Sequence, residues 1–161
     1  MWEESVIYIV EHDEINGAMG FVLNRPSRST TQKIFDQLHI LSYPNHSDVL
    51  YLGGPVRENN IYMIHSGNWY SASTQPVDSR LSWSYDDFMI EKMAMHDEPD
   101  EWNMYAGCAS WHSGQLESEL VDGSWLTIDA SPAIIFSSKK SQLWPICVEI
   151  YGQTMIDEHF A

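Results

Sequence analysis

Short apolar runs near the start of the chain predict paired β-strands. Residues 5–10 form a β-branched run, and residues 20–23 form a second run after a polar loop. Runs of this length bounded by turn residues are typical of buried strands. Asn16-Gly17 between them favours a tight hairpin turn. The pattern therefore predicts a hairpin, which ends at Pro26 because proline lacks a backbone hydrogen-bond donor.

A second set of extended segments follows along the rest of the chain. Residues 49–52 precede the turn at Gly53-Gly54-Pro55, and residues 61–65 alternate in polarity after it. Further extended segments are expected at residues 102–108, 125–128 and 133–136. Together these segments predict a mixed and twisted sheet.

Other segments have apolar residues three or four positions apart, which is the spacing of one helix face. Residues 31–38 place Ile34 and Phe35 on such a face behind a threonine cap. A capping box from Ser84 to Asp87 predicts the start of a second helix. Two later helices are expected at residues 116–120 and 143–151.

The composition indicates that these elements share one core. The chain has 161 residues, of which 43% are hydrophobic and 12% are aromatic, and this is enough for one sizeable core. No repeat, linker or low-complexity tract divides the sequence. We therefore predict an α/β (α+β) fold, a single compact domain over residues 1–161 with a mixed, twisted β-sheet and peripheral helices.

The charge of the chain argues against one broad class of partner. The sequence holds 23 Asp and Glu residues against 8 Lys and Arg residues, a formal net charge of −15. Proteins bind nucleic acid mainly through Lys and Arg contacts to phosphates. Direct binding of DNA or RNA is therefore not expected, and the acidic surface is also explained by solubility alone.

Cysteine use and the apolar runs indicate a protein of the cytoplasm. Cys108 and Cys147 are the two cysteines, and their spacing matches neither a zinc motif nor a disulfide framework. The first residues lack the basic segment and cleavage site of a secretion signal. No apolar run reaches the ~20 residues that cross a bilayer. We expect reduced thiols, no metal site, no cofactor and no association with a membrane.

The segment from Gly107 to Leu120 gathers the candidate chemistry of the chain. Cys108 is a candidate nucleophile, His112 is a candidate base, and Gly114 marks a turn where helix amides can face a ligand. If Cys108 ends a strand, His112 can fold back toward it, and a helix N-terminus lowers the pKa of a thiol. The small residues beside Trp111 also suit a tightly packed turn, and this interpretation is favoured.

Candidate binding residues lie in this junction and at the end of an earlier strand. They are Trp111, Gly114, Gln115, Glu117, Asn24 and Arg25. In the junction, the amide of Gln115 and the backbone of the turn can donate hydrogen bonds to an anion. The guanidinium of Arg25 can hold either a carboxylate of the protein or an anionic ligand, and the internal partner is favoured.

Several ordered motifs resemble one known family. They are Ser-Val-Ile-Tyr-Ile-Val-Glu-His (5–12), Gly-Ala-Met-Gly-Phe-Val-Leu-Asn-Arg-Pro (17–26), Leu-Gly-Gly-Pro-Val (52–56), Ser84 with Asp86, Gly-x-Ala-x-Trp-x-x-Gly-Gln-Leu-Glu (107–117) and Trp125-Leu126. These motifs span nearly the whole chain and resemble the AlgH/YqgE family of bacterial proteins. The resemblance implies a compact cytosolic α/β domain with no established reaction, in a family often labelled transcriptional regulator.

The resemblance also implies a difference at the N-terminus. Members of the family carry a first apolar strand ahead of the Ser-Val-Ile-Tyr segment, whereas this sequence starts shortly before residue 5. We therefore expect that strand to be missing and a sheet edge to be open for pairing with another chain. Self-association through this edge is one expected consequence.

Three classes of function fit the sequence, and the first is favoured. A non-enzymatic regulatory or protein-interaction module with an unidentified protein partner agrees with the lack of phosphate-loop, dinucleotide, metal-pair and serine-nucleophile motifs. The alternative is a small-molecule-binding protein or thiol enzyme that uses Cys108 and His112. The third class, an indirect transcriptional regulator, depends on the family label, because no basic recognition helix is present.

Overall fold

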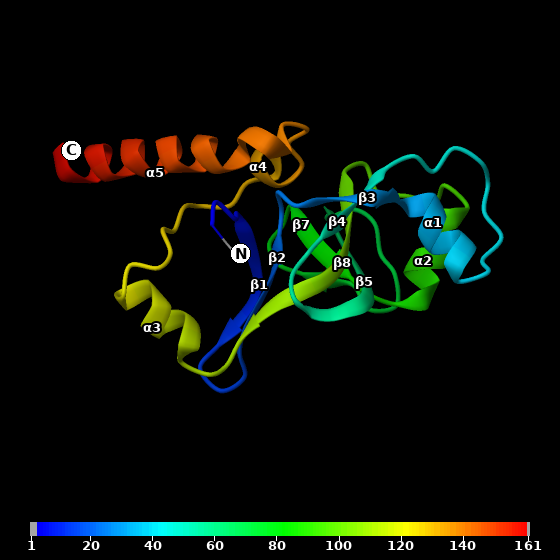
Figure 1. Cartoon of the computed structure of the whole chain (residues 1–161), viewed down its shortest axis with the longest axis horizontal. Helices are drawn as coiled ribbons and strands as arrows, with labels where there is room; N and C mark the ends of the chain where they lie inside the picture. Colours follow the sequence, from blue (N-terminus) through cyan, green and yellow to red (C-terminus); the bar gives the residue numbers. More distant parts are fainter. Residues whose placement is uncertain (1–2, 161) are drawn as a thin grey trace.

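One long strand near the middle of the sheet organises the fold. The computed structural model describes residues 3–160, and Figure 1 shows their arrangement. β8 (Trp102–Trp111) pairs antiparallel with β5 (Val56–Ser66) and parallel with β4 (Val49–Leu52). Its last residues pair antiparallel with β2 (Gly17–Val22). Strands from early and middle parts of the chain therefore meet on β8.

The remaining strands extend this sheet. β1 (Ile7–Asp13) forms the predicted hairpin with β2 and is the outer strand on that side among residues 3–160. β3 (Pro26–Thr30) pairs with β4, while β7 (Leu81–Ser84) and then β6 (Gln75–Pro76) follow β5. The described strand pairs are antiparallel except for β4 with β8, so the sheet is mixed. The predicted fold class is confirmed.

Helices pack against the sheet at three clusters of buried side chains. Figure 1 shows where these helices lie. α1 (Thr31–Gln37) and α2 (Asp87–Ala94) supply one cluster at one end of the molecule. α4 (Pro132–Ile135) and the start of α5 (Leu143–Phe160) supply the second. α3 (Gln115–Val121) packs against the third, which β1, β2 and β8 complete. Within residues 3–160, no helix has the length and apolar character needed to cross a bilayer.

α2 begins at an aspartate, and the predicted capping box is wrong. Asp86 is the N-cap residue, and its Oδ1 accepts a hydrogen bond of 2.8 Å from the backbone N–H of Met89. Ser84 lies in the buried strand β7, where its Oγ is 2.8 Å from Nε2 of His65. Ser84 therefore belongs to the strand, two residues before the N-cap, and Asp86 is the side chain that caps the helix.

Two predicted extended segments are wrong, and both lie after β8. Residues 133–136 fall in α4 and its C-cap, because the Ser131 side chain accepts from the N–H of Ile134 and proline occupies the first helical turn. Residues 125–128 form no strand. A short 3₁₀ helix, η1 (Lys140–Gln142), then leads into α5, which starts where predicted and runs on to Phe160.

Candidate functional site

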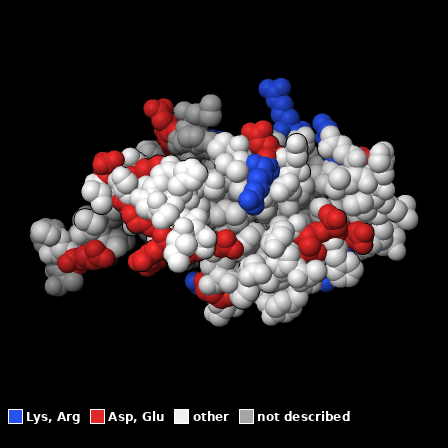
Figure 2. Space-filling view, turned by 90° about the horizontal axis from the view of Figure 1, so that it is seen from below, with Lys and Arg blue, Asp and Glu red and all other residues white. Residues whose placement is uncertain are grey.

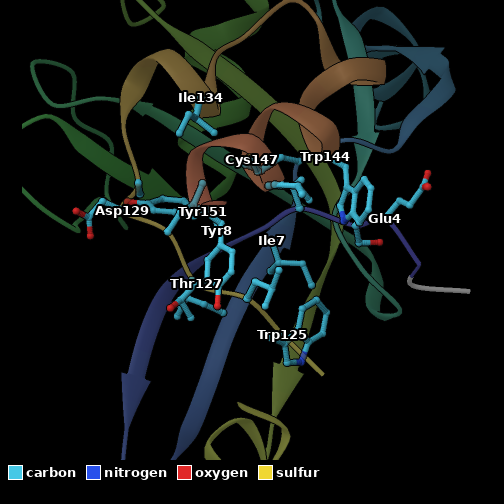
Figure 3. Close-up of a pocket in the computed structure, with 18 of the residues that line it drawn as sticks. Glu4, Ile7, Tyr8, Trp125, Thr127, Asp129, Ile134, Trp144, Cys147 and Tyr151 are labelled. Carbon is cyan, nitrogen blue, oxygen red and sulfur yellow. The ribbon is translucent and has the colours of Figure 1, made fainter. Parts of the chain in front are cut away.

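A groove with a volume of about 550 Å³ follows the outer edge of β1 (Figure 3). Residues 3–9 supply one wall, and residues 124–130 supply the opposite wall. Trp144 and Tyr151 of α5 close one side. This volume lies in the range of small-molecule sites, and the lining is mainly apolar.

Both faces of β1 contribute side chains to the groove. Ile7 and Ile9 pack against the cluster that contains Trp111, whereas Tyr8 belongs to the main core cluster. Successive side chains of a strand point to opposite faces of the sheet. The groove therefore runs around the edge of β1 instead of lying on one face.

Glu119 fixes two tryptophans at one end of the groove. Its Oε2 accepts hydrogen bonds from Nε1 of Trp125 at 2.7 Å and from Nε1 of Trp111 at 3.0 Å, and its Oε1 accepts one from Nε2 of Gln115 at 3.0 Å. The bond from Trp125, followed by those from Gln115 and Trp111, lowers the pKa of Glu119. The carboxylate is therefore ionised at neutral pH and orients both indoles.

The structure does not bring Cys108 and His112 together. β8 continues past its predicted end at residue 108, so Cys108 lies inside the strand and is only 1% exposed. His112 is exposed beyond the end of β8, and four extended residues place it about 13 Å further along. Burial raises the pKa of the Cys108 thiol, while a hydrogen bond with Tyr62 and the charge of Arg57 lower it only in part. This is the opposite of thiol activation.

Asn24 and Arg25 hold the chain segment that enters β1. Oδ1 of Asn24 accepts a hydrogen bond of 3.0 Å from the N–H of Val6. Nη2 of Arg25 donates to the carbonyl oxygen of Glu3 at 2.6 Å and to Oγ of Ser5 at 3.2 Å. The partner of Arg25 is therefore internal, but it is a backbone carbonyl and a hydroxyl where a carboxylate was expected.

The other predicted binding residues stabilise the turn and α3. Gly114 is the N-cap at φ 78°, and the side chain of Gln115 accepts a hydrogen bond of 3.0 Å from the N–H of His112. Glu117 pairs with His12 at the surface, and this contact lowers the pKa of Glu117. Of the predicted site residues, Trp111 is the one that lines the groove.

The rim of the groove is acidic. Glu3, Glu4 and Asp129 line it, and no Lys, Arg or His is among the described lining residues. Burial, followed by the charge of Asp78, raises the pKa of Tyr8 to about 12, so its hydroxyl is neutral. Figure 2 shows carboxylates spread over one face of the molecule with few basic side chains between them. In the described part of the chain, no three His, Cys, Asp or Glu side chains gather as a metal site would require.

The fold and the groove define a single-domain α/β protein with an apolar groove beside β1, the outer strand of the described part of the sheet. Residues 1–155 match a family model described as AlgH-like, and the chain belongs to this family. A UPF0301 protein of Proteus mirabilis is 33% identical, over 99% of this chain and 86% of that protein. A UPF0301 protein of Idiomarina loihiensis is 34% identical, over 94% of this chain and 83% of that protein.

Solved structures agree with this assignment. The solution structure of the AlgH protein from Pseudomonas aeruginosa has a TM-score of 0.80 and 34% identity, and the match covers 92% of this chain and 79% of that one. A protein from Corynebacterium diphtheriae has a TM-score of 0.68 over 89% of this chain and 75% of that one. At 20% identity, the second match shows the fold alone. The predicted family resemblance is confirmed.

Proposed function

We propose that this chain is a non-enzymatic interaction module of the cytoplasm that binds a protein partner in the groove beside β1. The observation that carries the proposal is the groove itself, an apolar site of about 550 Å³ beside β1, the outer strand among residues 3–160. Large exposed apolar sites with a polar rim mark interaction surfaces. A regulatory role would follow from the identity of the partner.

The groups that line the groove favour binding over catalysis. Cys147 is the cysteine among the described residues that line the groove, and burial raises the pKa of its thiol. No described lining residue offers a histidine or lysine as a base to activate a hydroxyl or thiol. Acting as a thiol enzyme through Cys108 therefore has no geometric support in this groove.

The proposed compartment follows from the cysteines. Cys108 and Cys147 are both unpaired, one buried and one half-buried. Free thiols of this kind suit a reducing compartment.

In-cell photo-crosslinking tests the proposal. Leu126 lines the groove and is 56% exposed, so p-benzoylphenylalanine in its place should form a discrete adduct heavier than the chain. The same group in place of Phe88 on α2, which is also 56% exposed and lies outside the groove, should not form that adduct. A partner bound in the groove predicts this difference.

A second substitution shows whether an adduct depends on the groove. Val148 of α5 lines the groove and is 37% exposed, so Val148→Asp should abolish the Leu126 adduct. Met155→Asp on the same helix is the matched control, because Met155 is exposed and lies outside the groove. No adduct at Leu126, or an adduct that survives Val148→Asp, contradicts the proposed function.

A further inference from the structure

We infer that a proton-sensitive latch holds residues 67–74 against β5 and β7, and that the latch opens when His65 takes up a proton. Residues 67–74, called the strap, connect β5 to β6, and two of their serines bind Asp86 at the start of α2. Figure 1 shows α2 at the end of the molecule opposite the C-terminal end of α5. Because no residue of β5, β7, α2 or the strap lines the groove beside β1, the latch is separate from the proposed binding site.

His65 of β5 is fully buried, and both of its ring nitrogens form hydrogen bonds. Nδ1 lies 2.8 Å from the carbonyl oxygen of Ser66, which can only accept, so Nδ1 carries a proton. In the neutral ring Nε2 is then an acceptor, and the hydroxyl of Ser84 donates to it across 2.8 Å. Burial lowers the pKa of His65, and the bond to Ser66 offsets this only in part, so the ring is neutral at pH 7.

The hydrogen bonds continue from Ser84 into the strap with a fixed direction. Because the hydroxyl hydrogen of Ser84 is used on His65, the hydroxyl of Thr74 must donate to Oγ of Ser84 across 2.7 Å. Oγ1 of Thr74 in turn accepts a hydrogen bond of 2.8 Å from the N–H of Ser71. Each hydroxyl therefore donates toward the imidazole, and this order requires an unprotonated Nε2.

A proton on Nε2 of His65 reverses this order. The imidazolium would donate to Oγ of Ser84, so the Ser84 hydroxyl would have to turn and donate to Oγ1 of Thr74. The hydroxyl hydrogen of Thr74 would then lose its acceptor and turn to water, since Thr74 is half-exposed. The strap would no longer donate into the protein at this point, and the ring beside it would carry a charge.

The charge on the ring would have no carboxylate partner in the described part of the chain. The residues in register with His65, Ser82 on β7 and Trp102 on β8, are uncharged. The charged groups on the surrounding elements are Lys92 and Asp97, which contact Trp69, Asp86, which binds Ser71 and Ser73, and Glu101, whose carbonyl accepts from Ser66. Within residues 3–160 no ion pair joins His65 to a carboxylate. A buried charge without a partner is strongly unfavourable, so the protonated ring favours a state in which water reaches it.

The strap can open because its own backbone contributes little to holding it. The one backbone–backbone hydrogen bond of residues 67–74 within the described chain runs from the N–H of Thr74 to the carbonyl of Ser71, at 3.4 Å. Side chains hold the rest, chiefly the bonds from Ser71 and Ser73 to Asp86. The pKa of Asp86 is lowered to about 2, so these bonds persist in mild acid and the bond at Thr74 is released first. Segments held in this way open locally at low cost.

The direction of the pKa shift sets the pH range of the latch. In the open strap His65 is solvated and titrates near its ordinary value of about 6.5, whereas in the closed strap burial lowers its pKa. The closed state is therefore favoured in full above about pH 6.5, and this preference is lost as pH falls from there toward the lowered pKa. One proton is taken up on opening, so the open population rises by up to about tenfold per pH unit in this range.

Amide hydrogen exchange measured by NMR reports the state of the latch. The N–H of Ser71 is bonded to Thr74, so its protection, corrected for intrinsic exchange, should fall by about tenfold between pH 7 and pH 5. The N–H of Met89 is bonded to Asp86 and should keep its protection over the same range. Constant protection at Ser71 would overturn the inference.

His65→Gln tests whether this histidine is the sensor, since glutamine does not titrate between pH 5 and pH 7. In this variant the fall in protection at Ser71 should disappear. His46→Gln is the matched control, because His46 is also buried but its Nε2 lies 3.0 Å from the carbonyl oxygen of Ala94, away from the latch. The fall should persist in the control, and its persistence in His65→Gln would assign it to another group and overturn the inference.

Thr74→Val tests the latch without changing the buried histidine. Thr74 is half-exposed, and valine keeps its branched shape but lacks the hydroxyl. The N–H of Ser71 should then be weakly protected at pH 7 already, with no further fall toward pH 5. A fall as large as that of the unmodified chain would show that Thr74 is not the latch, whether or not His65→Gln folds.

Nitrogen NMR of the imidazole tests the hydrogen-bond order in the unmodified chain. At pH 7 the ring of His65 should carry its proton on Nδ1 and none on Nε2, and it should titrate below about pH 6.5 together with the loss of protection at Ser71. A proton on Nε2 at pH 7, or a titration of His65 that leaves Ser71 unchanged, overturns the inference. These measurements need no occupant in the groove, so the crosslinking result at Leu126 decides the proposed function separately.

Discussion

The thiol of Cys108 is a packing group in the centre of β8. It is 1% exposed within the core cluster that also holds Tyr62, and burial raises its pKa. The reactive species of a thiol is the thiolate. We therefore expect Cys108 to react with iodoacetamide far more slowly than an unfolded cysteine at pH 8, measured in a Cys147→Ser background. Fast labelling with an apparent pKa below that of a free thiol, about 8.5, would contradict this assignment and restore the thiol-enzyme hypothesis.

The sequence predicts that some single residues line the groove and misses others. Trp111 could be selected from the sequence because it lies in a motif with glycine and glutamine. Glu119 could not, since its role depends on indole contacts from Trp111 and Trp125 that exist only after α3 folds against β8. Its spacing of four residues from Gln115 indicates the helical contact but says nothing of the tryptophans.

At the scale of elements, α2 is expected to depend on one carboxylate. Burial raises the pKa of Asp86, but hydrogen bonds from Ser71, Ser73 and the N–H of Met89 outweigh it and lower the pKa to about 2. Since the folded pKa lies below the unfolded value of about 3.9, Asp86 stabilises the fold above that pH, and this contribution is lost as pH falls through about 2.

Asp86→Asn keeps an oxygen that can cap the helix but replaces the charged Oδ2 that accepts from Ser73, so it should destabilise the protein by about 1–2 kcal/mol at pH 7, and by less near pH 2, in urea unfolding. Asp87→Asn is the matched control, because Asp87 is an exposed residue of the first turn of the same helix. An equal loss of stability at both pH values would show that the charge of Asp86 has no part in the cap.

β8 passes so close to the turn before β5 that there is no room for a side chain at Gly107. Gly107 has φ 75°, and a Cβ there would lie 2.6 Å from the carbonyl oxygen of Gly54. Gly107→Ala should lower the free energy of unfolding by about 3–5 kcal/mol, because backbone must move on both sides. Gly123 has φ 76° with nothing within 4 Å, so Gly123→Ala should cost about 1 kcal/mol. Similar losses for the two variants in denaturant unfolding would contradict a steric crossing.

Elements were predictable where local pattern and tertiary packing agree. The β1–β2 hairpin was predicted where it occurs, although its loop is residues 14–16 and Gly17 of the predicted turn is already paired with Asp13 in β2. α1 follows from an apolar face that acts over a few residues. Residues 125–128 have an apolar pattern like that of a strand, but no described strand pairs with them. Residues 133–136 became a helix because Ser131 and Pro132 favour a helix start over extension.

For the whole molecule, the fold class was predictable and the groove beside β1 was not. Composition and alternation indicate one domain with a mixed sheet, and the structure confirms this class. The groove is formed by residues 3–9, 124–130 and α5, which lie far apart in the sequence. Its walls are recognisable only when the sheet order shows that β1 is the outer strand of the described chain.

The position of β8 has a consequence for synthesis on the ribosome. Ala18 of β2 is in register with Trp111 of β8, and Leu50 of β4 with Met104 of β8. β2 and β4 are therefore synthesised long before the strand with which they pair. An isolated two-stranded hairpin such as β1 with β2 is at best marginally stable in water. Contacts that are distant in sequence also slow folding. The nascent chain is therefore expected to expose its apolar strands until β8 emerges from the exit tunnel. During this interval the chain is most prone to aggregate and most dependent on chaperones.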